Sequence, residues 1–329
     1  MRDAFEHELK VAVEAARRAA TLSANVARGI PPAMAKADQS PVTVADFASQ
    51  ALICRALGEA FAGDPIIAEE DSTALRQCDQ KELLNQVVEQ VRRIEPIADV
   101  DSVCRWIDRG GARNASERFW TLDPIDGTKG FLRKQQYAIA LALIVGGEPV
   151  VAALACPNLT MPDGSIGAIF TAVSGQRAMA RPLHGDGDAT PVRVSETSAT
   201  SASRFCESFE SSHSSHGDSQ RLAELLNITR PPVRMDSQVK YAVVARGEAD
   251  IYLRMPARAD YVENIWDHAA GVLVVRQAGG SVTDIAGRKL DFTHGAKLEA
   301  NRGIVVTNGR LHDAVLAAIE TLKPGMMRT

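Results

Sequence analysis

The sequence predicts an α+β protein in two parts, separated by a polar, glycine-containing segment at 185–189. Amphipathic helical segments come first, and short β-like runs separated by turn signals follow them. In the second half, strands alternate with helices. Helices followed by antiparallel strands are typical of an α+β domain, and alternation is typical of an α/β layer. We therefore expect an α+β domain over residues 1–184 and a smaller α/β domain over 185–329.

The helices of the first part are predicted from apolar residues that repeat at spacings of three and four. The first ends at Gly29 and the Pro31-Pro32 pair, and the second ends before Pro65. The polar segment 95–119 shows no clear period. It is either a flap over a site or a surface insertion, and we favour the insertion. The three predicted helices cover 3–28, 44–60 and 79–94.

The strands are predicted from short runs of β-branched and aliphatic residues bounded by glycine, proline and asparagine. A buried strand at 65–68 runs directly into three acidic residues. Short connections between the runs after residue 136 indicate antiparallel hairpins. These runs lie at 137–145, 150–156, 166–173 and 176–180. In the second half we expect strands near 203–208, 232–236, 249–254, 281–284 and 303–307, and helices over 219–227, 238–246, 266–278 and 310–322.

The segment 120–131 is the strongest candidate for a site. An apolar strand ends there in Asp123 and Asp126, and Pro124 between them disfavours the α region for Asp123. Gly127 permits close approach of the backbone, and Thr128 adds a hydroxyl at a predicted helix start. Carboxylates beside free backbone N–H groups suit Mg²⁺ with a phosphate ester. The alternative is an ordinary turn, because Asp, Pro and Gly all favour turns.

Three further acidic positions have both a structural and a functional interpretation. Asp46 follows Thr43 by three residues, which fits a helix capping box. Glu69 lies at the exit of a buried strand, where sites often form, although acidic runs are commonly solvated. Asp267 precedes an apolar helical segment and is either a cap or a further carboxylate of the same site.

Basic and hydroxyl side chains in the second half suggest an anion site. Ser237 and Lys240 lie about one helical turn apart, and Arg254 ends a predicted strand. Arginine and lysine together can hold a phosphate group, although each alone is more commonly a surface charge. His268 and His294 are expected to be packing or surface residues, because Mg²⁺ prefers oxygen ligands.

Composition excludes several classes of protein. The chain has 329 residues and a net charge of −4, which gives no basis for nucleic-acid binding. We find no apolar run of 18 residues and no signal-peptide core, so we expect no membrane partner and a cytoplasmic location. Five widely spaced cysteines predict free thiols, not a disulfide frame or a zinc site.

Together these motifs resemble the lithium-sensitive, Mg²⁺-dependent phosphatases of the inositol monophosphatase superfamily, particularly the 3′(2′),5′-bisphosphate nucleotidase branch. The resemblance covers roughly residues 40–308, and segment 72–119 is not a close match. It implies the layered αβαβα sugar-phosphatase fold. The superfamily motifs are Ala68-Glu69-Glu70, the Leu122–Thr128 segment and Trp266–Gly271. The branch motifs include 40–46, 129–131, 156–158, 207–216, 237–240 and 252–254.

The resemblance also implies a role for each matching residue. Two or three Mg²⁺ ions and a small phosphate ester, 3′-phosphoadenosine 5′-phosphate, are expected as cofactor and substrate. Asp46 and Thr128 match the pair that orients the attacking water. The matching metal ligands are Glu69, Asp123, Asp126, Asp267 and the carbonyl of Ile125. The matching substrate-binding residues are Gly127, Thr128, His213, Ser237, Lys240, Arg254 and Asp267.

Two alternatives stay open from the sequence. An inositol phosphate such as inositol 1,4-bisphosphate is a second possible substrate. The second alternative is a non-catalytic nucleotide-binding protein on the same fold. The presence of all five carboxylates argues against it, namely Asp46, Glu69, Asp123, Asp126 and Asp267. A monomer or weak homodimer is expected.

Overall fold

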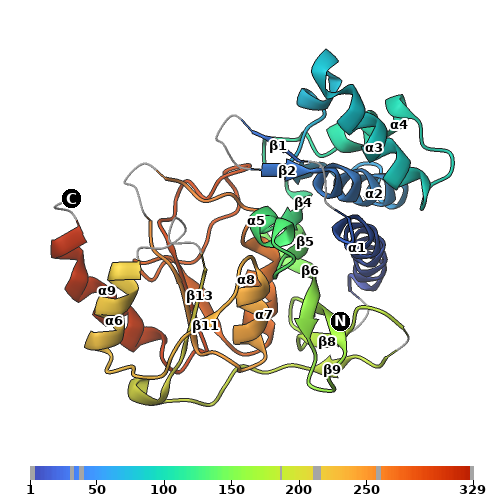
Figure 1. Cartoon of the computed structure of the whole chain (residues 1–329). Coiled ribbons are helices and arrows are strands. Elements are labelled where there is room, and N and C mark those ends of the chain that lie inside the picture. Colours follow the sequence, from blue (N-terminus) through green and yellow to red (C-terminus); the bar gives the residue numbers. More distant parts are fainter. Residues whose placement is uncertain are drawn as a thin grey trace.

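The computed structural model shows layers of helices alternating with two main β-sheets (Figure 1). It describes residues 4–29, 33–36, 41–185, 187–209, 216–256 and 261–326. Helices form both outer layers and the layer between the sheets, so the predicted α+β, αβαβα order is confirmed. In order across the molecule, the helical layers contain α1 (Glu6–Ala27) with α2 (Val44–Ala60), α7 (Val239–Ala245) with α8 (Ala269–Gln277), and α6 (His216–Leu225) with α9 (His312–Met326).

The first helical layer packs through small residues. One face of α1 is rich in alanine, including Ala12, Ala16 and Ala19, which lie fully buried. Small side chains allow α1 to approach both α2 and the first sheet closely. The amphipathic helix α3 (Lys81–Arg92) covers the outer side of α2. The three helices predicted from periodicity are thus confirmed.

Helix α4 (Val100–Asp108) corrects the expectation that 95–119 is irregular. Asp99 caps this helix, because its carboxylate accepts the N–H of Ser102 at 2.7 Å, and the Asp99 N–H donates to the Ser102 hydroxyl at 2.8 Å. Val103 and Ile107 are buried, and α4 packs on α2. The segment is therefore part of the helical layer, not a flap over a site. The capping residue Asp99 and the spacing of the apolar residues are the sequence signals that could have predicted this helix.

The first sheet has seven strands in the order β3-β4-β5-β6-β7-β8-β9. Neighbouring strands from β4 onward run antiparallel, as predicted, but β3 and β4 run parallel and pair Ala68 with Leu122. The connection between them carries α3 and α4, as a parallel crossover requires. The strands are β3 (Ile66–Ala68), β4 (Arg118–Asp126), β5 (Ala138–Val145), β6 (Glu148–Thr160), β7 (Ile166–Val173), β8 (Met179–Pro182) and β9 (Thr190–Pro191).

The second sheet has five strands in the order β11-β10-β12-β14-β13. Strands β10, β11 and β12 are parallel, whereas β14 pairs antiparallel with β12 and β13. This mixed sheet confirms the predicted α/β character of the second half. The strands are β10 (Phe205–Glu207), β11 (Val233–Arg234), β12 (Ile251–Arg254), β13 (Ser281–Thr283) and β14 (Ile304–Thr307).

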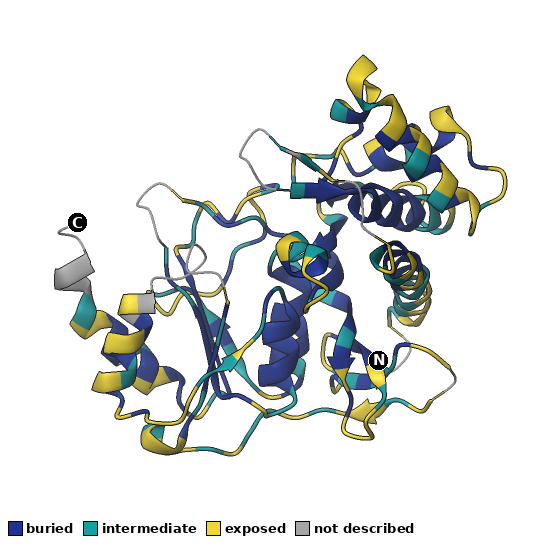
Figure 2. Ribbon diagram, viewed as in Figure 1, coloured by how far each residue is buried: buried dark blue, intermediate teal, exposed yellow. Residues whose placement is uncertain are grey.

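Three apolar clusters fill the spaces between the layers. Figure 2 shows that buried residues occupy the sides of the helices and strands that face one another. One joins α1 and α2 to the first sheet, and another lies beneath α6 and α9. The middle cluster contains residues of both halves, such as Phe170 and Val272, around α7 and α8. The division of the chain near residue 185 stays a prediction.

Shorter elements complete the fold. A two-stranded hairpin of β1 (Ala33–Ala35) and β2 (Pro41–Thr43) leads into α2, and α5 (Thr128–Leu132) follows β4. All five cysteines are free, as expected. No described helix is both long and apolar enough to cross a membrane. The 3-10 turns are η1 (Ala74–Arg76), η2 (Cys78–Gln80) and η3 (Thr200–Ala202).

Candidate active site

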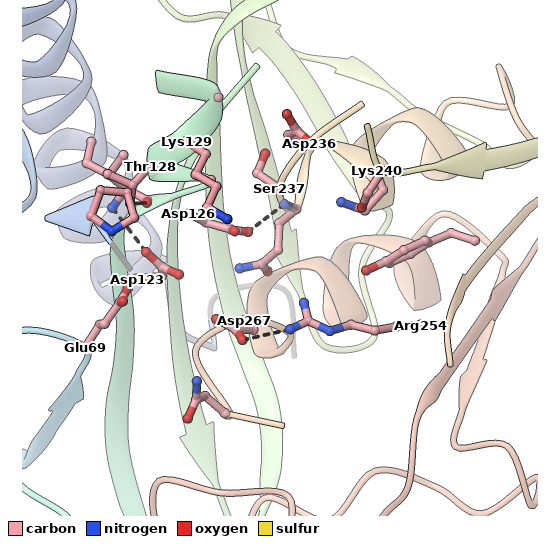
Figure 3. A pocket seen from close by; sticks show the side chains of 18 of the residues that line it. Glu69, Asp123, Asp126, Thr128, Lys129, Asp236, Ser237, Lys240, Arg254 and Asp267 are labelled. Carbon is pink, nitrogen blue, oxygen red and sulfur yellow. Dashed lines mark hydrogen bonds and ion pairs between the residues drawn. The ribbon is translucent and has the colours of Figure 1, made fainter. Parts of the chain in front are cut away.

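A cavity of about 410 Å³ opens where β4, β12 and the starts of α5, α7 and α8 meet (Figure 3). The carboxylates of Glu69, Asp123, Asp126 and Asp267 form one wall of the cavity, the acidic wall. The side chains of Ser237, Lys240 and Arg254 form the opposite wall. The structure therefore brings most of the predicted site residues together from both halves of the chain. The predicted residues that line it are Glu69, Asp123, Ile125, Asp126, Gly127, Thr128, Ser237, Lys240, Arg254 and Asp267.

Asp123 and Asp126 are placed by an irregularity near the end of β4. The pairing with β5 shifts register between these two residues. Asp123 turns back to accept the N–H of Ile125 at 3.1 Å. Gly127 then adopts φ = 88°, a left-handed conformation that favours glycine, and α5 begins at Thr128. The turn interpretation and the site interpretation of this segment are therefore compatible.

Glu69 reaches the same wall because β3 runs parallel to β4. Parallel neighbours end at the same edge of a sheet, so the residue after Ala68 lies beside the residue after Leu122. The Glu69 N–H donates to the Leu122 carbonyl at 3.3 Å, which continues the pairing. The carboxylates of Glu69 and Asp123 are consequently neighbours, although 54 positions separate them in the sequence.

Asp46 fulfils both interpretations made from the sequence. Its Oδ2 accepts the Thr43 N–H at 2.8 Å and the Thr43 hydroxyl at 2.6 Å, which completes the capping box of α2. Its Oδ1 lies 3.2 Å from the hydroxyl of Thr128, which is also 3.2 Å from the Ile125 carbonyl. One carboxylate oxygen thus caps the helix, and the other faces Thr128.

Asp267 is not the cap of α8. The helix begins at Ala269, with His268 at the N-cap position and no side-chain capping bond. Asp267 instead lines the cavity, where its Oδ2 lies 3.5 Å from Nη2 of Arg254. His268 and His294 are packing and surface residues, as predicted, because the first is fully buried and the second is paired with Asp291.

Burial and repulsion between carboxylates raise the pKa of three carboxyl groups at or beside the acidic wall. Burial, with a contribution from Glu69, raises the pKa of Asp46 to about 7. Burial and the charge of Asp267 raise the pKa of Asp126 to about 7. Burial and three neighbouring carboxylates hold the pKa of Asp123 well above its usual range. Such a wall attracts cations and fits hard divalent ions with oxygen ligands.

In the described part of the chain, one group of three side chains offers potential ligand atoms within 4.8 Å of one another. It contains Glu263, Asp267 and His268, of which only Asp267 belongs to the predicted set. The other predicted carboxylates form no such group of three among the described residues, and each accepts a hydrogen bond from a donor of its own. Lys36 holds Glu69, the Ile125 N–H holds Asp123, and the Gln238 N–H holds Asp126 at 2.6 Å.

The opposite wall carries Ser237, Lys240 and Arg254. Ser237 lies in the turn before α7 with φ = 64°, outside the helix predicted over 238–246. Lys240 is buried, and its Nζ lies 5.2 Å from the centre of the Tyr252 ring. Among the described residues, no hydrogen-bond or ion-pair partner is found for that ammonium group. His213 lies outside the described residues.

Comparison with known proteins identifies the fold family. The sequence profile of the inositol monophosphatase family matches residues 5–323. The chain belongs to this family. It is 41% identical over 337 residues to a 3′(2′),5′-bisphosphate nucleotidase of Schizosaccharomyces pombe, covering 95% of each chain. It is 42% identical over 292 residues to the protein of that name from Dictyostelium discoideum, covering 87% of each.

Solved structures of the inositol monophosphatase family share the fold. An inositol monophosphatase from Anabaena superposes with a TM-score of 0.62 at 23% identity, covering 96% of each chain. An IMPase from Thermotoga maritima gives a TM-score of 0.67 at 20% identity, covering 97% of this chain and 99% of the other. The family is metal-dependent, in agreement with the acidic wall.

Two residues at this inositol monophosphatase-type site escaped the sequence analysis. Lys36 directly follows β1, and its Nζ lies 2.6 Å from carboxylate oxygens of both Glu69 and Glu70. Glu263 pairs with Arg254 beneath the cavity at 2.9 Å. In the sequence, Lys36 lies in a polar loop that shows no hydrophobic periodicity, so nothing singled it out. Glu263 lies four residues before Asp267, and that spacing alone gave no reason to select it.

Proposed function

We propose that the chain is a Mg²⁺-dependent 3′(2′),5′-bisphosphate nucleotidase, a phosphoric monoester hydrolase. Its substrate is 3′-phosphoadenosine 5′-phosphate, and its products are AMP and inorganic phosphate. The names of its relatives and the composition of the cavity support this proposal.

The choice of substrate rests on Lys240, which is buried and has no hydrogen-bond or ion-pair partner among the residues that the structure describes. Burial lowers the pKa of Lys240, although Asp126 opposes the shift. A cation in such a place calls for an anionic partner. Arg254 on β12 and the Ser237 hydroxyl line the same cavity. A substrate with two phosphate groups can bind to both walls of the cavity. One phosphate binds the acidic wall through bound cations, and the other binds Lys240 and Arg254 directly.

Two or three Mg²⁺ ions fit the acidic wall. Glu69, Asp123, Asp126, Asp267 and the Ile125 carbonyl are the proposed ligands. Bound Mg²⁺ supplies a water of lowered pKa and neutralises charge on the phosphoryl oxygens. The mutual repulsion of the carboxylates supports this assignment, because bound cations relieve it.

Asp46 and Thr128 are the proposed catalytic residues. The Thr128 hydroxyl can donate its hydrogen to Asp46, which leaves the oxygen free to accept a hydrogen bond from the attacking water. This bond orients the water towards phosphorus. Asp46, with its pKa raised to about 7 by burial, can receive a proton passed through Thr128. No covalent intermediate on the protein is required.

The remaining assignments are proposals of the same kind. Gly127 gives the substrate access to the backbone, and His213 contacts the nucleotide. We place the protein in the cytoplasm as a monomer or weak homodimer, with free thiols that suit a reducing compartment. The chain divides into domains 1–184 and 185–329, and substrate lies between them.

Phosphate release from a substrate panel tests the proposal. The panel contains 3′-phosphoadenosine 5′-phosphate, its 5′-phosphosulfate analogue, inositol 1,4-bisphosphate and inositol 1-phosphate, each with Mg²⁺ or with EDTA. We expect the highest kcat/KM for 3′-phosphoadenosine 5′-phosphate and no turnover in EDTA. A clear preference for inositol 1-phosphate overturns the substrate assignment, whereas full activity in EDTA overturns the metal assignment.

A further inference from the structure

The guanidinium of Arg254 is held from behind by Glu263. Its Nε lies 3.0 Å from Oε1 and 2.9 Å from Oε2 of that carboxylate. Its Nη2 donates to the Tyr261 hydroxyl at 3.1 Å. With the Nε edge engaged, the Nη atoms are the part of Arg254 that faces the cavity (Figure 3).

Glu263 is itself fixed by a buried chain of hydrogen bonds. Its Oε2 lies 3.2 Å from Nε2 of the fully buried His268, and Nδ1 of that ring lies 2.7 Å from the Tyr241 hydroxyl. The two contacts agree with one tautomer, in which Tyr241 donates to Nδ1 and the Nε2–H donates to Glu263. Because Tyr241 lies on α7 and His268 precedes α8, both central helices anchor the carboxylate.

Glu263 also competes with the acidic wall for Arg254, because it forms the shorter ion pair. The next carboxylate to Arg254 is Asp267, at 3.5 Å, which is one of the proposed metal ligands. Without Glu263, the guanidinium of Arg254 would be stabilised most by a shorter ion pair with Asp267, because charge-assisted hydrogen bonds form readily in a partly buried site. That movement would draw the Arg254 guanidinium away from the second phosphate of the substrate.

We propose that Glu263 is a positioning residue that reserves Arg254 for the second phosphate of the substrate. This inference rests on the proposed function. Glu263 touches neither the reacting phosphate nor the attacking water. It acts through Arg254, and it therefore contributes to the preference for bisphosphates over monophosphates.

The test compares two nucleotides that differ in the second phosphate. KM and kcat are measured for 3′-phosphoadenosine 5′-phosphate and for 3′-AMP with wild-type protein, Glu263→Ala and Glu263→Gln. Glu248→Gln is the matched control, since Glu248 pairs with an arginine away from the cavity. We expect Glu263→Ala to raise KM for the bisphosphate roughly tenfold to a hundredfold, with kcat and the values for 3′-AMP nearly unchanged.

Glu263→Gln keeps the shape of the side chain and one acceptor for Arg254, so it should restore part of the lost affinity. It also provides a folded variant if Glu263→Ala is unstable. The affinity for AMP, measured by calorimetry, does not depend on turnover. It should be highest for the wild-type protein, lower for Glu263→Gln and lowest for Glu263→Ala. Equal losses on both nucleotides, or no loss on either, overturn the inference. Failure of the proposed function looks different, because wild-type protein would then hydrolyse neither nucleotide.

Discussion

The hydroxyl of Thr128 lies 3.2 Å from Oδ1 of Asp46, while Oδ2 of the same carboxylate caps α2 through Thr43. The two functions of Asp46 can therefore be separated by mutation. Asp46→Asn keeps an oxygen for the cap but can replace the acceptor of Thr128 by an amide. We expect it to lower kcat about 10²- to 10⁴-fold.

Thr43→Ala is the complementary control. It removes the capping hydroxyl and should cost about 1 kcal/mol of unfolding free energy. Its kcat should fall far less than that of Asp46→Asn, since the Thr43 N–H still holds Asp46. Thermal unfolding and phosphate release distinguish the two effects. Near wild-type turnover in folded Asp46→Asn would contradict the assignment of Asp46.

Replacing Lys240 by methionine should improve stability while harming substrate binding. The substitution removes a buried charge that has no ion-pair partner among the described residues, so the melting temperature should rise. KM for the bisphosphate should increase about tenfold or more, because a phosphate loses its cation. Lys134→Met, at an exposed position, is the control. A lower melting temperature with unchanged KM would show that Lys240 is structural.

The stabilisation of the protein by Mg²⁺ should increase with pH. Burial raises the pKa of Asp46 and of Asp126 to about 7, far above the 3.8 of an unfolded chain. In EDTA, their contribution to stability is therefore greatest below about pH 4 and falls as pH rises through 7. Mg²⁺ favours the ionised carboxylates and opposes this loss. The difference in melting temperature between Mg²⁺ and EDTA should be larger at pH 8 than at pH 5, and a flat difference would contradict it.

Lys36 should compete with divalent cations for Glu69. Its Nζ lies 2.6 Å from oxygens of Glu69 and Glu70, and these charges hold the pKa of Lys36 above its usual value despite burial. Lys36→Met should lower the melting temperature in EDTA, because two neighbouring carboxylates lose their counter-charge. The Mg²⁺ concentration that gives half of the thermal shift should also fall. An unchanged Mg²⁺ response would show that the ion does not meet Glu69.

Gly271 should tolerate no side chain. A Cβ built there would lie 2.3 Å from Cγ of Tyr241, across the contact between α7 and α8. Gly271→Ala is expected to cost about 1–3 kcal/mol of unfolding free energy. Gly63→Ala is the control, because nothing lies within 4 Å of its Cβ position. Equal denaturant midpoints for the two variants would show that Tyr241 can move aside.

Local chemistry explains why much of the fold was predictable. The apolar period of α1 and α2, the turn signals between β5 and β8, and the capping pair Thr43 and Asp46 all act within a few residues. Helix α4 carried the same kind of signal at Asp99, but polar residues around it obscured the period. The parallel pairing of β3 with β4 had no local signal, since it depends on a crossover through α3 and α4.

The sequence by itself determined the family, the layered α+β fold and the residue types of the candidate site, because motifs and periodicity are local properties of the chain. The tertiary structure decided which of those residues face one cavity. Strand pairing places Glu69 beside Asp123, and α8 begins after Asp267, so that Asp267 lines the cavity and does not cap the helix. The ion pairs of Lys36 with Glu69 and of Glu263 with Arg254 also appear only in the tertiary structure. Contacts between distant segments depend on packing and charge in three dimensions, and short-range sequence patterns do not encode them.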